Sequence, residues 1–182
     1  MNYKIKNAER KIEEHELKTE EFTNLLEEAL GQASRALSKE RLEYISSLLK
    51  NSLTDEELGH IEERESLSIL NELNDAEIIL LQSCLPIQYV SDEFLEKHKK
   101  ILSITPLYQD CSTSEQDQQA FQKSYKEKLI RLGLLREIYQ RYEQDELPEF
   151  NEETGRLKAN HYQVSPLGYS LLRIIDIQIK EN

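Results

Sequence analysis

The sequence predicts a mainly α-helical protein, in which an N-terminal helical segment precedes a winged helix-turn-helix-like domain with a small two-stranded wing. The first observation is composition: the 182 residues are 38% hydrophobic and 32% charged, with only five Gly, four Pro and no Trp. Such a scarcity of helix breakers is typical of helical proteins. The second observation is the order of patterns over residues 128–175, where a helix ending at Gly133 is followed by a strand, a polar loop, a second strand and a capped helix.

Residues 5–37 are predicted to form one long helix, because apolar and small residues recur there at alternating spacings of three and four. The stripe comprises Ile5, Ala8, Ile12, His15, Thr19, Phe22, Leu26, Ala29, Ala33 and Ala36, and Leu25, Leu30 and Leu37 widen its second half. Such a helix either packs within a bundle or forms an intermolecular coiled coil. It would be about 50 Å long, longer than the following domain is wide, so we expect a homodimer with two-fold symmetry. The predicted dimer interface comprises Phe22, Leu26, Ala29, Ala33 and Ala36.

Two shorter helices complete the predicted N-terminal segment, residues 1–73. Ser38 is the expected N-cap of the first helix, whose inward residues would be Leu42, Ile45, Leu48 and Leu49. Residues 54–57 have the capping-box pattern Thr-Asp-Glu-Glu. They open the second helix, which runs towards Leu73 with Leu58, Ile61, Leu67 and Leu70 inward. The domain boundary is predicted near Asn74.

The predicted winged-helix-like domain, residues 74–182, begins with a capped apolar helix over residues 78–81 that ends before Pro86. Ser91 would cap a short helix carrying Phe94, Leu95, His98, Ile101 and Leu102. Residues 103–116 are predicted to form a loop. Near its end, Ser114 opens the next helix, with Phe121, Tyr125, Leu129 and Leu132 inward. We expect Leu81 and Ile174 in the core, so that truncating either to Ala costs about 2–5 kcal/mol.

The wing itself is predicted from turn and cap signals. Gly133 suits the position that follows a helix C-terminus, and residues 135–142 have strand composition, with Ile138, Gln140 and Tyr142 on one face. A polar loop over residues 145–159 leads back to a second strand that contains Tyr162 and Val164. Ser165 and Pro166 then occupy the N-cap and first position of the last helix. Its apolar face would comprise Leu167, Leu171, Ile174 and Ile175.

Charge bears on which partner the wing could contact. The formal net charge is -12 and the pI is near 4.9, yet residues 118–141 hold six basic and two acidic residues. A DNA-binding interpretation uses this window, with Gln118 beside Gln119, Gln122, Lys123, Lys126, Arg131, Arg136 and Arg141. The overall acidity argues against it, because neutralising phosphates supplies most non-specific affinity. We therefore favour an unidentified protein partner over nucleic acid.

Catalytic and metal motifs give no support for an enzyme. The five glycines are scattered, so no glycine-rich phosphate loop is present, and there is no nucleophile-elbow motif. Glu57 and His60 form a single carboxylate–histidine element, whereas di-iron bundles require two. Cys84 and Cys111 lack metal-site spacing and are expected to be reduced thiols. We predict no cofactor or metal, no membrane span because no apolar run reaches about 18 residues, and a cytoplasmic protein.

Three segments resemble a known family: residues 67–81, where a helix ends and an apolar helix follows an Asn-Asp-Ala cap; residues 128–135, containing Leu-Gly-Leu; and residues 162–172, containing Ser-Pro-Leu-Gly. In these segments the chain is similar to the bacterial Abi-alpha-like proteins, a family of unknown function associated with phage abortive infection. The resemblance implies a winged-helix-like C-terminal domain and carries no catalytic residues. We expect a non-enzymatic protein-interaction module in bacterial or phage conflict. The alternative is a DNA-binding winged-helix transcriptional regulator.

Overall fold

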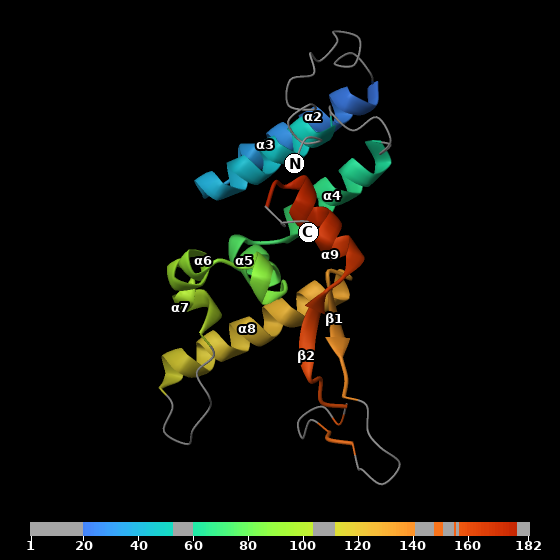
Figure 1. Ribbon diagram of the computed structural model, residues 1–182. Coiled ribbons are helices and arrows are strands. Elements are labelled where there is room, and N and C mark those ends of the chain that lie inside the picture. The colour runs from blue at the N-terminus through green and yellow to red at the C-terminus, as the bar shows by residue number, and fades with distance from the viewer. Residues whose placement is uncertain are drawn as a thin grey trace. The chain divides into compact units, whose positions relative to one another are not determined.

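The computed structural model describes residues 20–52, 60–103, 112–140, 148–150, 155 and 157–177 (Figure 1). The described chain is mainly helical, with 69% of it in helices and one small two-stranded antiparallel sheet. This confirms the predicted fold class of a helical protein with a small wing. The predicted helix over residues 5–19, Leu58 and the capping box at residues 54–57 lie outside the described residues.

The chain divides into two compact units, and the second is inserted in the sequence of the first. Unit 1 comprises residues 1–75 and 170–182, and unit 2 comprises residues 76–169. The second boundary falls inside the last helix, α9 (Pro166–Ile174), so this one helix supplies residues to both units. We predicted two domains, residues 1–73 and 74–182. That these two parts are separate domains stays a prediction.

Unit 1 is built from α2 (Glu20–Ala33), α3 (Lys39–Ser52), α4 (His60–Glu72) and the C-terminal half of α9. Helix α2 packs on both α3 and α4, and α3 packs on α4 (Figure 1). The predicted cap at Ser38 is confirmed, because its Oγ accepts a hydrogen bond from the Arg41 backbone N–H at 3.0 Å. The buried apolar residues of this unit are Phe22, Leu25, Ala29, Ile45, Leu48, Leu67, Ile69, Leu70, Leu73, Leu171, Leu172 and Ile175.

The predicted long helix is wrong at its C-terminal end. Helix α2 stops at Ala33, and residues 34–35 form a turn in which the Ser34 Oγ donates to the Gly31 carbonyl at 2.8 Å. The reason is local, because Ser38 can cap α3 only from a non-helical backbone. The predicted stripe is only partly right. Leu25, expected to widen it, is fully buried, whereas Leu26 is only partly buried and Leu30 and Leu37 are exposed, because α3 and α4 pack on the side of α2 that carries Phe22, Leu25 and Ala29.

Unit 2 contains the helices α5 (Asp75–Ser83, from residue 76 onward), α6 (Asp92–Lys97), α7 (Lys99–Leu102) and α8 (Thr113–Arg131), with a 3₁₀ turn over Ile87–Tyr89. Strands β1 (Leu135–Ile138) and β2 (His161–Val164) pair antiparallel, with Leu135 opposite Val164. Leu81 is fully buried, as predicted. The other buried apolar residues are Ile78, Leu80, Leu85, Val90, Leu129, Leu134, Leu135 and Val164.

Two helix boundaries in unit 2 differ from prediction. Ser112, rather than Ser114, caps α8, and it forms a complete capping box with Glu115. The Ser112 hydroxyl and backbone N–H both donate to the Glu115 carboxylate at 2.8 Å, and these bonds lower the pKa of Glu115. The helix capped by Ser91, whose Oγ accepts from the Phe94 N–H, breaks at His98 into α6 and α7.

Several predicted inward faces are rotated as well. On α8 the buried residues are Gln122 and Leu129, whereas Phe121 is 60% exposed. On α9 Leu171 and Leu172 are buried, as is Ile175 just after its end, whereas Leu167 is 41% exposed. Ile174, predicted to be core, is only partly buried, so we now expect a smaller cost for Ile174→Ala. Leu42 is 44% exposed on α3. Strand β1 ends at Ile138, earlier than predicted. In each helix the neighbouring elements, rather than its own periodicity, decide which side is inward.

The junction between α8, the wing and α9 is held by three residues of the sequence motifs. Gly133 has φ +72°, and the N–H groups of Gly133 and Leu134 donate to the carbonyls of Ile130 and Leu129, which is a Schellman cap. The Ser165 hydroxyl donates to the Gly133 carbonyl at 2.5 Å and accepts from the Gly168 N–H at 3.0 Å. The strand-to-helix turn is thereby tied to the end of α8.

Gly168 generates the first testable prediction. A Cβ at Gly168 would lie 2.4 Å from the Leu134 carbonyl oxygen, a backbone atom that cannot rotate away. We expect Gly168→Ala to lower the free energy of unfolding by roughly 2–3 kcal/mol or more. Gly31→Ala is the matched control, because a Cβ there meets nothing within 4 Å and should stabilise helix α2 by up to about 1 kcal/mol. Urea unfolding followed by circular dichroism measures both, and equal effects would contradict the assigned packing.

Candidate functional site

The glutamines proposed to read bases are used to hold α8 in place. The Gln122 side-chain amide is buried and donates to the carbonyls of Ile101, at 2.5 Å, and Ser103, at 3.0 Å. The Gln118 amide donates to the Lys100 carbonyl at 2.7 Å. These bonds satisfy the last carbonyls of α7, which have no helical partner. Gln122 is therefore not on the surface, where the predicted DNA-binding cations would have to lie beside it. Gln119 is half-buried.

Lys126 packs at the junction of α8 with the wing. Its ammonium lies 5.2 Å from the centroid of the Tyr162 ring, a cation–π contact across to β2. Burial raises the pKa of the Cys84 thiol, and the nearby Lys126 charge partly offsets that rise. Desolvation, with the Glu137 charge, raises the pKa of Tyr162. A raised pKa favours the protonated form of the partly buried Cys84 thiol.

The remaining predicted DNA contacts lie on the surface with acidic neighbours. Lys123, Arg131 and Arg136 are exposed, while Arg141 lies outside the described residues. The exposed charged positions of α8 are two cations, Lys123 and Arg131, and two anions, Asp117 and Glu127. Their charges cancel, so the exposed side of this helix lacks the basic excess that phosphate binding requires.

An aromatic pair lies on the exposed side of α8. Phe121 is 60% exposed, and its ring stacks on Tyr125 with centroids 6.2 Å apart and an interplanar angle of 26°. Asp117 precedes Phe121 by four residues, as Phe121 precedes Tyr125, so the three lie on one side of the helix, and we call the surface that they form the α8 face. A large exposed aromatic side chain is typical of a protein-binding surface. In the sequence, Phe121 and Tyr125 are four residues apart in a predicted helix, but this spacing was interpreted as an inward face.

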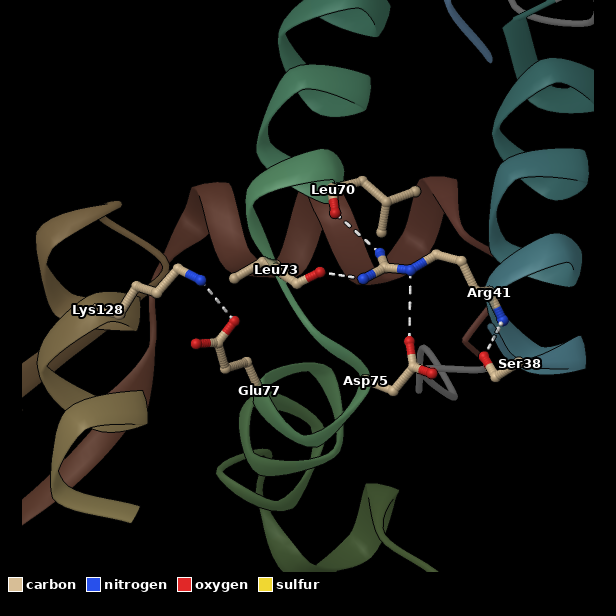
Figure 2. Close-up of polar contacts among 7 residues, drawn as sticks. All are labelled: Ser38, Arg41, Leu70, Leu73, Asp75, Glu77 and Lys128. Atoms are coloured by element: carbon tan, nitrogen blue, oxygen red, sulfur yellow. Dashed lines mark hydrogen bonds and ion pairs between the residues drawn. The ribbon is translucent and has the colours of Figure 1, made fainter. Parts of the chain in front are cut away.

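In unit 1 the side chain of Arg41, in the first turn of α3, has three polar partners (Figure 2). Its guanidinium donates to the carbonyls of Leu70, at 2.8 Å, and Leu73, and its Nε lies 3.3 Å from the Asp75 carboxylate. Carbonyls at the C-terminal end of a helix lack helical partners, so the planar fork of Arg41 caps the end of α4. Arg41 is thus a structural residue that the sequence analysis missed.

A hollow of about 250 Å³ lies beside this cap, lined by Gln32, Arg35, Ala36, Leu37, Arg41, Ile45, Asn71, Leu73, Asn74 and Asp75. The Gln32 amide donates to the Leu67 carbonyl at 3.1 Å, and the Arg41 fork is aimed at α4. Two of the polar side chains that line the hollow, Gln32 and Arg41, therefore serve the helix packing. No group of three His, Cys, Asp or Glu side chains that could hold a metal occurs within the described ranges.

Glu77 and Lys128 form a second polar cluster, within unit 2 (Figure 2). The Glu77 side chain on α5 is 3% exposed, and one of its oxygens accepts from the Lys128 ammonium on α8 at 2.8 Å. A carboxylate buried this deeply is tolerated because a charged partner offsets its lost hydration. The pair joins α5 to α8, and Lys128 is committed to it rather than to a ligand.

The residues predicted for the homodimer interface divide between core and surface. Phe22 and Ala29 are buried within the chain, whereas Leu26, Ala33 and Ala36 are partly exposed. Ala36 lies beyond the end of α2. The homodimer stays a prediction, and within the described residues it rests on Leu26, Ala33 and Ala36.

No described helix combines the length and apolarity needed to cross a membrane. No protein-family model, curated protein or solved structure matches this chain.

The cap on α4 predicts that Arg41 cannot be replaced by another cation. Arg41→Lys keeps the charge but loses the fork that serves two carbonyls and Asp75 at once. We expect the free energy of unfolding to fall by about 1–3 kcal/mol. Lys39→Met is the control from the same helix, because the Lys39–Glu43 pair is exposed and its loss should change stability by less than about 0.5 kcal/mol. Chemical denaturation distinguishes the two, and a lysine that substitutes without loss would disprove the cap.

Because Glu77 is buried, we expect the single variant Lys128→Met to be less stable than the double variant. Lys128→Met removes the ammonium while Glu77 stays buried, which should cost about 2–4 kcal/mol. Adding Glu77→Gln removes the buried charge, so the double variant should recover part of the loss. Lys158→Met breaks the exposed Lys158–Glu149 pair, formed at a similar 3.0 Å, and should cost under about 0.5 kcal/mol. Thermal unfolding checks the series, and a double variant no more stable than Lys128→Met would count against the pair.

Proposed function

We propose that this chain is a non-enzymatic protein-interaction module and that the α8 face is one of its binding surfaces. The observation that carries the proposal is Phe121, a large aromatic ring held 60% exposed on the helix that a DNA-binding winged helix would place in the major groove. Stacking on Tyr125 fixes the ring in position before binding. A preorganised aromatic anchor loses little conformational freedom on association, which favours protein–protein contact.

The exposed positions of α8 are poorly suited to DNA. Asp117 and Glu127 cancel the charges of Lys123 and Arg131, and the Gln122 amide is occupied inside the unit. A DNA-reading helix gains affinity from cations that contact phosphates, and each carboxylate placed beside them repels the same phosphates. These observations support the protein-interaction function over the alternative of a DNA-binding transcriptional regulator.

The setting we propose is bacterial or phage conflict, and it is supported by the sequence resemblance to the Abi-alpha-like proteins. Most of the residues that we place in the three resembling segments build the scaffold. Gly133, Ser165 and Gly168 close the junction between α8, the wing and α9. Phe121 and Tyr125 of the α8 face lie outside those segments. The resemblance therefore does not extend to the proposed binding surface, and we propose a partner that is specific to this chain.

Phe121→Ser tests the proposed function. Because Phe121 is exposed, we expect a change in unfolding free energy of less than about 0.5 kcal/mol, but about a tenfold or greater loss of bound partner, as for a central aromatic anchor. The measurement is quantitative co-purification of tagged full-length chain from its native host. Gln116→Ala, at another exposed position of α8, is the matched control and should retain the partner.

The DNA alternative is tested in parallel by titrating duplex DNA at about 50 mM salt, where counterion release most favours binding. We expect no micromolar affinity. Micromolar binding that Lys123→Glu with Arg131→Glu abolishes would replace the proposed function with DNA binding. These two substitutions leave the Lys126–Tyr162 contact intact, so a loss of binding could not be attributed to a disrupted junction.

A further inference from the structure

The exposed side of α8 continues along the length of the helix beyond the α8 face. Its exposed residues follow one another at spacings of four and three, which places them along one line of a helix: Thr113, Asp117, Ala120, Ser124, Glu127 and Arg131. The exposed Phe121 borders this line on one flank and the exposed Lys123 borders it on the other. We call these residues together the α8 strip.

The charges of the α8 strip alternate in sign along the helix. From the N-terminal end they are negative, positive, negative and positive, at Asp117, Lys123, Glu127 and Arg131. Ser124 lies midway between Asp117 and Arg131, seven residues from each. An antiparallel copy of α8 that crosses at Ser124 would therefore place Asp117 opposite Arg131 of the second copy. Lys123 would lie within one turn of Glu127 of the second copy, whereas a parallel copy in register would place like charges opposite each other.

The uncharged residues of the strip fit the same antiparallel arrangement. Ala120 and Ser124 are small, so two helices that cross there can approach closely. Phe121 and its stacking partner Tyr125 lie on one flank of the crossing point. A two-fold axis perpendicular to both helices brings the aromatic pair of the second copy to that same flank. The four rings would then form one cluster and cover Phe121, which is 60% exposed in the single chain.

We propose that the partner of the α8 face is a second copy of this chain, and that two α8 strips pack antiparallel in a homodimer. The inference rests on the proposed function, because it uses the same surface and names its partner. It places the dimer on α8 instead of on the helix predicted over residues 5–37. Lys123 and Arg131 also interact within the single chain, but interactions at exposed positions contribute little and can be exchanged for contacts with the second copy.

The size of the strip sets the expected affinity. Helix α8 has 19 residues and is about 28 Å long, so its exposed side is smaller than the roughly 800 Å² that each partner contributes to a standard interface. We therefore expect a dimer that dissociates in the micromolar range.

Charge-swapped variants of the full-length protein test the antiparallel register. Asp117→Arg places two cations opposite each other and Arg131→Asp places two anions opposite each other, so each variant alone should dimerise about tenfold or more weakly than the wild type. An equal mixture of the two variants restores both ion pairs in a heterodimer, which should form within about threefold of the wild-type affinity. Sedimentation equilibrium over about 1–300 μM measures the three samples. Both positions are exposed, so circular dichroism should show an unchanged fold.

A disulfide tests the crossing point. Ser124→Cys places a thiol at the two-fold axis, where it can reach the same thiol of the second copy, so mild oxidation should give a covalent dimer. Gln116→Cys is the matched control, because Gln116 is also exposed on α8 but lies about 12 Å along the helix from the crossing point. Cys84 and Cys111 are present in both variants and cannot account for a difference between them.

The proposal is overturned if the wild-type chain stays monomeric over this concentration range, or if Ser124→Cys forms no more covalent dimer than Gln116→Cys. A dimer that neither charge swap weakens belongs to another surface and overturns it as well. A monomeric wild-type chain whose host partner is lost with Phe121→Ser would overturn the homodimer and leave the proposed function standing. If Phe121→Ser leaves both the dimer and every co-purifying protein unchanged, the proposed function and this inference fail together.

Discussion

The hydroxyl of Ser165 makes two hydrogen bonds on which the junction of α8, the wing and α9 depends. This hydroxyl ties the start of α9 to the end of α8 through the Gly133 carbonyl, and it also caps α9 at the Gly168 N–H. Helix α9 can then lie against Leu134 only because Gly168 lacks a side chain. The same helix also gives Leu171 and Leu172 to unit 1.

How well a feature could be predicted from the sequence depends on how far apart in the sequence its interacting residues lie. The caps at Ser38, Ser91 and Ser165 and the turn at Gly133 were predicted correctly, because a cap is decided within about three residues of chain. The inward faces of α2, α8 and α9 were partly wrong. A rotation of one position separates Leu25 from Leu26, and only the helices packed around α2 decide between them.

The candidate site could be located from sequence but not interpreted. The basic window indicated α8 and the wing, and we place the proposed surface on α8, yet residue type alone could not show that Gln122 is buried or that Lys126 lies over Tyr162. Both assignments needed the contacts of α8 with residues distant in sequence. Phe121 shows the converse error, since an aromatic residue at helical spacing is usually core and here lies in solvent. Arg41 was missed because its carbonyl partners on α4 are 29 and 32 residues away.

Because unit 2 is inserted in the sequence of unit 1, the two units can complete their cores at different times during synthesis. Unit 2 is continuous in sequence, so its core is fully available once residue 169 has been synthesised. Unit 1 is completed only afterwards, because α2, α3 and α4 must wait for the late-made Leu171, Leu172 and Ile175. During this interval the apolar sides of the early helices remain incompletely covered on the ribosome. Nascent unit 1 is therefore the part of this protein most exposed to chaperones, proteases and aggregation.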